Sequence, residues 1–234
     1  MVDRTAQLDL LAYGDIEIEG RMPWSSNATF LVDVTSGDVT AKAIYKPMRG
    51  ERPLWDFEPG LHRRELAAYR LSEAMDIDLV PPTVIRDGPL GEGSVQWFVD
   101  ADHQQHYFTI HEAREDLHDR MREIAVFDLL ANNTDRKSGH VLIDGTSHLW
   151  GIDHGLCFAA EFKLRTVVWE FGGEPVVEHL LSAVDRIARA VPTDIATLLA
   201  DDEVEAIAER AQWVIDHPVL PVDTTGRRYP WPLV

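Results

Sequence analysis

The chain has 234 residues, of which 45% are hydrophobic and 26% charged, and a formal net charge of −18. Such a chain can bury a sizeable core and is not of the disordered type, and its acidity argues against nucleic acid and anionic membranes as partners. The single cysteine, Cys157, excludes an internal disulfide framework, and without a signal-peptide or membrane-span pattern we expect a cytoplasmic protein.

The first 99 residues predict a small antiparallel sheet with one helix. Alternating hydrophobicity within 16–46 indicates two strands joined by the turn Thr-Ser-Gly-Asp, with Lys46 near the end of the second strand. The apolar spacing of 61–75 predicts a helix, and Glu65 lies at the edge of its apolar stripe. Two further strands are expected on either side of a glycine-containing loop at 87–93.

The rest of the chain is predicted to be mainly helical. Apolar residues three or four apart indicate a helix within 115–133, and the patterns of 176–191 and 201–217 indicate two more. Between them, the strands Val-Leu-Ile-Asp and His-Leu-Trp-Gly-Ile-Asp form a hairpin around the turn at 145–147. We therefore expect an α+β fold.

Three polar residues converge at the mouth of this hairpin. If the turn is centred on Thr146, His140 lies opposite Ile152 and therefore beside Asp153. Asp135 belongs to the loop that enters the same mouth. Polar groups grouped at the end of an apolar hairpin are costly unless they bind something, so this cluster is a candidate site.

The cluster matches the parts that phosphoryl transfer requires: one acid to orient the acceptor hydroxyl, and two ligands for a metal ion that bridges phosphates. The remaining parts should lie upstream. Lys46 is placed to hold phosphate oxygens, and Glu65 on the following helix can orient that lysine.

Five short strings occur in the order found in one family. The sequence resembles the phosphatidylinositol 3- and 4-kinase superfamily, and most of all the type II phosphatidylinositol 4-kinases and bacterial phosphatidylinositol kinase-like proteins. The resemblance covers about residues 20–160. Its strings are Ile44-Tyr45-Lys46-Pro47, Arg64-Glu65-Leu66-Ala67-Ala68-Tyr69 with Val80-Pro81-Pro82, Gly93 to Val99, Asn133-Thr134-Asp135-Arg136, and Gly151-Ile152-Asp153-His154-Gly155-Leu156.

This resemblance implies a two-lobed protein-kinase-like fold, with residues 1–97 as the N-lobe and 98–234 as the C-lobe. It implies ATP and Mg²⁺ or Mn²⁺ as cofactors. Asp135, Lys46 and Glu65 would be catalytic, and Asp153 and His140 would bind the metal. The nucleotide would be held by Lys46, by a phosphate-covering loop at Ser25, Ser26 and Asn27, and by a hinge for adenine at Gln96, Trp97, Phe98 and Val99.

Two departures from the family pattern bear on chemistry. Ser25-Ser26-Asn27-Ala28 stands where the family has a glycine-rich loop, so hydroxyl and backbone N–H donors would do that work. His140 stands where the family has Asn, and imidazole prefers softer metals than magnesium, which favours manganese or a changed metal number.

The expected activity is an ATP-dependent kinase that phosphorylates a hydroxyl of a soluble small molecule or protein, with autophosphorylation as one form. Stable membrane association is not expected, because the sequence has no basic amphipathic or lipidation signal. Lys163 and Arg165 could recognise an anionic acceptor or balance nearby acids. The alternatives are a catalytically inactive nucleotide-binding module, a phosphatidylinositol kinase, and a metal-dependent phosphohydrolase.

Overall fold

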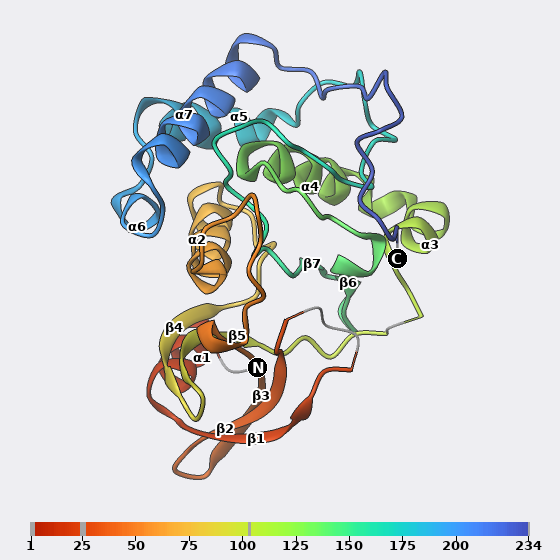
Figure 1. The fold of residues 1–234 in the computed structure, drawn as a ribbon. Helices are drawn as coiled ribbons and strands as arrows, with labels where there is room; N and C mark the ends of the chain where they lie inside the picture. Colours follow the sequence, from red (N-terminus) through yellow and green to blue (C-terminus); the bar gives the residue numbers. More distant parts are fainter. Residues whose placement is uncertain (1–2, 24–26, 103, 234) are drawn as a thin grey trace.

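The structure is a computed structural model that describes residues 3–23, 27–102 and 104–233. Figure 1 shows a sheet at one end of the molecule, most of the helices at the other, and a short hairpin between them. The helices are α1 (Arg4–Tyr13), α2 (Leu61–Ala74), α3 (Tyr107–Ala113), α4 (His118–Ala131), α5 (Glu178–Arg189), α6 (Thr193–Ala196) and α7 (Asp201–Asp216). The strands are β1 (Asp15–Arg21), β2 (Phe30–Ser36), β3 (Val39–Pro47), β4 (Thr83–Gly88), β5 (Gly91–Trp97), β6 (Val141–Ile143) and β7 (Leu149–Gly151).

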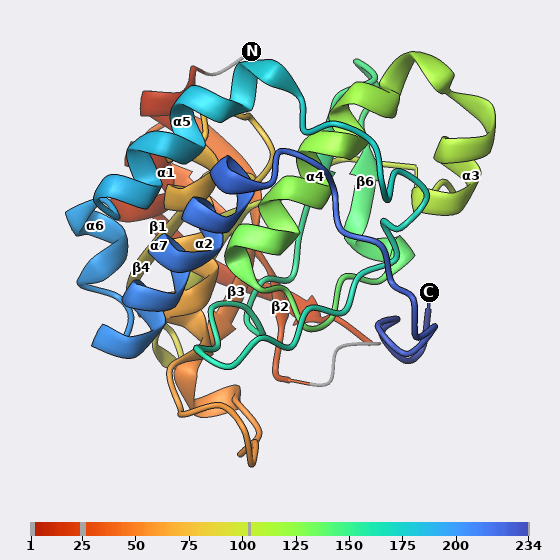
Figure 2. The same cartoon turned by 90° about the horizontal axis from the view of Figure 1, so that it is seen from above.

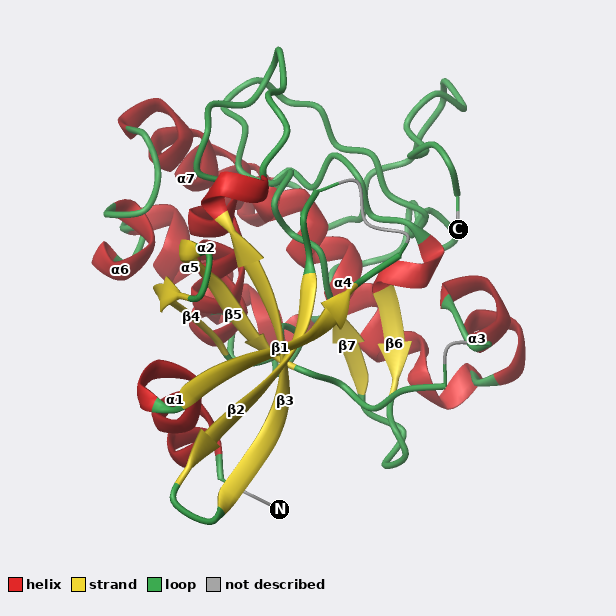
Figure 3. Ribbon diagram, turned by 60° about the horizontal axis from the view of Figure 1, so that its bottom comes forward, coloured by secondary structure: helices red, strands yellow, loops and turns green. Residues whose placement is uncertain are grey.

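The five N-terminal strands form one antiparallel sheet in the order β1-β2-β3-β5-β4, which Figure 3 shows in yellow. The β2–β3 hairpin turns between Ser36 and Val39, as predicted. The loop predicted at 87–93 was wrong, because Gly88 pairs with Gly91 and both strands run through most of that range. Gly93 instead lets β5 pass close to β3, since a Cβ there would lie 2.4 Å from the carbonyl oxygen of Lys46.

Helix α1, which the sequence analysis did not predict, packs on the sheet beside β4. The Oδ1 of Asp3 caps it by accepting a hydrogen bond from the N–H of Ala6 at 2.9 Å. Leu10 and Leu11 are buried against the sheet core. The sheet therefore has two associated helices, because α2 packs on β4 and β5 as well.

The largest core lies between α2 and the helical region. Tyr69 and Leu71 of α2 pack there with the buried residues of α4, α5 and α7. Figure 2 shows α5 and α7 running beside each other above α2 and next to α4. Among the described residues, no helix is both long and apolar enough to cross a bilayer.

Candidate active site

The β6–β7 hairpin has the register that the sequence predicts. Val141 pairs with Gly151, and the N–H of Ile152 donates to the carbonyl of His140 at 3.0 Å. His140 and Asp153 therefore lie side by side, with His140 Nε2 3.5 Å from Asp153 Oδ2. The prediction that these two residues meet at the mouth of the hairpin is confirmed.

Lys46 joins the sheet, helix α2 and the hairpin at one point. Its Nζ donates to Oε1 of Glu65 and, at 2.8 Å, to Oδ1 of Asp153. The second carboxylate oxygen of Glu65 accepts from the backbone N–H of His154 at 3.1 Å. Glu65 is only 2% exposed, so it is not a solvated helix charge, and it links the lysine to the chain beyond β7.

The charges of this cluster are strongly coupled. Burial opposes the ammonium form of Lys46, but the carboxylates of Asp153 and Glu65 outweigh burial and raise its pKa. The Lys46 ammonium in turn holds the pKa of Asp153 far below its usual range. Both groups are charged at neutral pH, and about half of the Asp153 side chain stays exposed to the cleft.

Asp153 has an unusual backbone conformation for a residue with a side chain. Its φ is 62°, in the left-handed region that disfavours a Cβ. Such strain persists only where the surroundings enforce it and is common at functional sites. Here the β7 ladder before it and the contact of Glu65 with His154 after it hold the chain, and the carboxylate points at Lys46.

Asp135 lies in the loop that leads to β6. Its Oδ2 accepts from Lys137 Nζ at 2.6 Å, and its backbone N–H donates to Oδ1 of Asn133 at 3.0 Å. Burial raises the pKa of Asp135, although the ammonium of Lys137 opposes that rise. A carboxylate with a raised pKa is a better proton acceptor, and Lys137 is a site residue whose role the sequence analysis missed.

His140 is kept neutral by its surroundings. Burial lowers its pKa to about 4, even though the adjacent carboxylate of Asp153 favours the charged form. A neutral imidazole is the form of histidine that can ligate a metal ion.

The cleft between these groups is a cavity of about 610 Å³. Six residues from the predicted site line it: Asn27, Lys46, Glu65, Asp135, His140 and Asp153. Ser25 and Ser26 of the predicted phosphate loop lie outside the described residues.

The four residues expected to receive adenine do not line this cavity. The Gln96 side chain donates to the Thr83 hydroxyl at 2.9 Å and is buried. The backbone N–H groups of Trp97 and Phe98 donate to the carbonyls of Pro82 and Lys42, and Val99 is 9% exposed. Their assignment as the adenine hinge stays a prediction.

A buried ion pair that the sequence analysis did not predict holds the site together. Arg136 and Asp128 are both fully buried, with Nη2 2.9 Å from Oδ1. Arg136 also donates to the carbonyl of Ile152 at 3.1 Å and to Nε2 of His154 at 2.7 Å. Arg136 therefore ties the Asp135 loop to the end of β7.

The C-terminal segment also reaches the cleft. Pro232 lines the cavity, and the carbonyl of Leu233 accepts from the N–H of Ser138 at 2.8 Å. Figure 1 places this end of the chain near β6. No sequence motif pointed to this contact.

The donor set suits a metal ion that shares its ligands with a nucleotide. Among the described residues, no group of three or more His, Cys, Asp or Glu side chains could hold a metal on its own. Asp153 and His140 offer two donors, and Mg²⁺ in phosphoryl-transfer sites takes one or two protein ligands plus phosphate oxygens and water. The residues present fit a metal brought in with a triphosphate.

Comparisons with known proteins bear on the family and the fold of this chain. The model of the family described as "Phosphatidylinositol 3- and 4-kinase" matches residues 83–177. "Protein Rv2133c" from Mycobacterium tuberculosis (strain ATCC 25618 / H37Rv) is 39% identical over 260 residues, which cover 95% of this chain and 94% of that protein.

Two solved structures share the fold. The Helicobacter pylori proinflammatory kinase CtkA is 11% identical with a TM-score of 0.54, and the match covers 90% of this chain and 94% of that chain. The structure of hydra Fam20 with sugar is 12% identical with a TM-score of 0.60, covering 91% and 87%. The two-lobed, kinase-like α+β fold predicted from the sequence is confirmed.

Proposed function

Because this chain belongs to the phosphatidylinositol 3- and 4-kinase-like superfamily, we propose that it binds ATP in the cleft and transfers the γ-phosphate to a hydroxyl group. The observation that carries the proposal is the position of Lys46, which bonds to Glu65 and Asp153 across the cavity. A lysine held by a helix carboxylate and facing a metal-binding acid is the arrangement that organises a triphosphate in kinases.

In this proposal Lys46 binds phosphate oxygens and Glu65 fixes its direction. Asp135 orients the acceptor hydroxyl and takes up its proton, a role that its raised pKa favours. Asp153 and His140 would hold a magnesium or manganese ion, which when bound neutralises charge on the β- and γ-phosphates. Asn27 lies in the cavity lining, and its Oδ1 accepts from the backbone N–H of Arg52 at 2.9 Å, which leaves its amide N–H groups as donors for a phosphate.

The acceptor is proposed to be a soluble small molecule or protein that carries an anionic group. A separate hollow of about 240 Å³, the basic hollow, lies along the segment after Asp153. It is lined by Lys163, Arg165, Arg227 and Arg228. Lys163 is already 3.5 to 3.6 Å from the acids Glu161 and Asp56. Arg165 has no carboxylate within 4 Å among the described residues, so it is the stronger candidate for an anionic acceptor.

One observation favours the catalytically inactive alternative. His140 fills the position of the family's Asn and lies 3.5 Å from Asp153, so an imidazole replaces an oxygen ligand. An inactive module would bind ATP in the cleft without transferring phosphate.

The test is incubation with γ-labelled ATP and either Mg²⁺ or Mn²⁺, with the protein alone, with cell extract, and with phosphatidylinositol vesicles. Wild type is compared with Asp135→Asn, and ATP affinity is measured for both. Label that is transferred by wild type and not by Asp135→Asn supports the proposal. ATP binding without transfer selects the inactive module, and release of labelled phosphate to water without any labelled acceptor selects a phosphohydrolase.

A further inference from the structure

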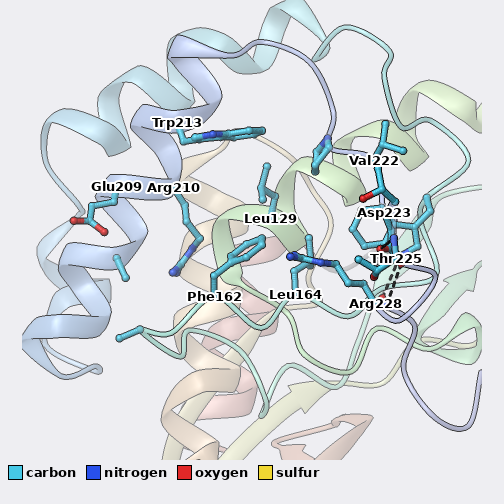
Figure 4. Close-up of a pocket in the computed structure, with 15 residues that line it drawn as sticks. Leu129, Phe162, Leu164, Glu209, Arg210, Trp213, Val222, Asp223, Thr225 and Arg228 are labelled. Carbon is cyan, nitrogen blue, oxygen red and sulfur yellow. Dashed lines mark hydrogen bonds between the residues drawn. The ribbon is translucent and has the colours of Figure 1, made fainter.

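A second cavity, of about 460 Å³, lies in the helical region and shares no lining residue with the cleft. Figure 4 shows it between α7, the end of α4, the segment around Phe162, and the C-terminal segment around Val222. Its walls are mainly apolar, with Leu129, Phe162, Leu164, Trp213 and Val222 among them. Both its size and its lining are typical of a small-molecule site.

One wall of this cavity carries a buried positive charge. Arg210 on α7 is 8% exposed, and its Nε donates to the Leu130 carbonyl at 2.9 Å. Its Nη1 lies 3.5 Å from the carbonyl of Ala159, and its Nη2 is buried with no hydrogen-bond partner among the described residues. No carboxylate of the described chain lies within 4 Å of this guanidinium, which is costly in an apolar setting unless an anion joins it.

A second guanidinium borders the same cavity. Arg228 lies 5.0 Å from the centroid of the Phe162 ring and also lines the basic hollow described above. The apolar cavity and the basic hollow therefore meet at Phe162, Leu164 and Arg228. This border joins an apolar chamber to a positively charged opening.

The lining also holds two acids, Asp223 and Glu209, which offset part of these charges. Asp223 accepts hydrogen bonds from the N–H and hydroxyl of Thr225, at 2.9 and 2.6 Å, and from the N–H of Arg228 at 3.0 Å, and these neutral donors leave its negative charge in place. Figure 4 shows the Glu209 carboxylate directed away from the cavity. The excess of positive charge lies at the opening, where the basic hollow adds Lys163, Arg165 and Arg227 to Arg228 and has no acid among the described residues of its lining.

We propose that this cavity binds an amphipathic organic anion, with its apolar body against Leu129, Phe162 and Trp213 and its carboxylate or phosphate head held by Arg228 at the border with the basic hollow. The buried charge of Arg210 in the same wall also favours an anion. A guanidinium group can donate two parallel hydrogen bonds to two oxygens of either head. A ligand here would contact both the segment after Asp153 and the C-terminal segment that ends at the cleft. The inference needs neither ATP binding nor phosphate transfer in the first cavity.

The test is isothermal titration calorimetry of the full chain with four probes that share one ten-carbon chain. Decanoate and decyl phosphate carry the anionic head, decanol a neutral one, and decyltrimethylammonium a cationic one. At least one anionic probe is expected to bind about tenfold or more tightly than decanol. The better of the two anions identifies the head group. Equal affinity for decanol, tighter binding of the cation, or no binding by either anion overturns the proposal.

Variants locate the site. Arg228→Gln and Arg210→Gln should each lower the affinity for the better anionic probe about tenfold and leave the affinity for decanol unchanged. Arg189→Gln, at an exposed position on α5, is the matched control and should change neither. Arg210 bonds to backbone carbonyls, so circular dichroism checks that its variant is folded, and Arg228→Gln decides the question if it is not. Unchanged affinity of Arg228→Gln for the anionic probe contradicts the assignment.

Discussion

Replacing Asp128 by Asn tests the buried ion pair that supports the site. The substitution keeps the shape of the side chain but removes the charge that neutralises Arg136, and both side chains are fully buried. The Asp128 carboxylate also accepts from the Asn133 amide at 3.0 Å and from the Thr166 hydroxyl at 2.9 Å. Breaking a buried pair from one side costs about 3–5 kcal/mol, a large share of the roughly 5–15 kcal/mol of a whole domain.

The measurement is the free energy of unfolding in urea, followed by tryptophan fluorescence and checked for a two-state transition. The double variant Asp128→Asn/Arg136→Met removes both charges and should be less destabilised than the sum of the two single variants. Asp185→Asn breaks an exposed pair with Arg189 and should cost less than about 1 kcal/mol. A loss below about 1 kcal/mol for Asp128→Asn, or strict additivity in the double variant, would refute the reasoning.

Three further predictions address the sheet, the hairpin and the cleft. Gly93→Ala places a Cβ 2.4 Å from the carbonyl oxygen of Lys46, and the resulting backbone shift should lower the free energy of unfolding in urea by about 1–3 kcal/mol. An unchanged urea midpoint of unfolding would contradict this. The pKa of Asp144 is lowered to about 2, because hydrogen bonds from Thr146 and neighbouring groups outweigh partial burial. This carboxylate therefore adds stability above its unfolded pKa of about 3.9 that is lost as pH falls toward 2, about 1 kcal/mol after discounting for exposure. The unfolding free energies of Asp144→Asn and wild type should thus differ at pH 6 and converge in acid, whereas a constant difference would count against the role. Glu65→Gln should lower kcat/KM for ATP at least about tenfold, since Lys46 loses its fixed partner, and activity equal to wild type would remove Glu65 from the proposed mechanism.

Local sequence patterns were sufficient to predict those parts of the fold that depend on residues close together in the chain. A short turn and strands of fixed period set the register of β6 and β7, so the pairing of His140 opposite Ile152 could be predicted. The helical spacing around Leu61 placed Glu65 toward the core for the same reason.

Glycines and capping residues were harder to interpret. Gly93 lies inside β5, where it allows close strand approach, but in the sequence it resembles a loop residue. Helix α1 depends on an Asp3 cap and on two leucines that face the sheet, and its polar residues hide that pattern.

Contacts between distant segments could not be predicted. The partners of Arg136 come from α4 and from the end of β7, and no spacing in the sequence indicates that they meet. The same holds for the Leu233 contact with Ser138 and for the burial of Arg210 without a carboxylate. These depend on how the helical region is assembled, which a pattern along one chain does not reveal.

The most direct test of the account is a crystal structure of the protein with a non-hydrolysable ATP analogue and Mn²⁺ or Mg²⁺. We expect the triphosphate in the first cavity, with Lys46 on its oxygens, the ion at Asp153 and His140, and Asp135 facing the γ-phosphate. An analogue bound elsewhere, or a cleft that stays without nucleotide at saturating concentrations while Lys46 and Asp153 remain paired, would contradict it.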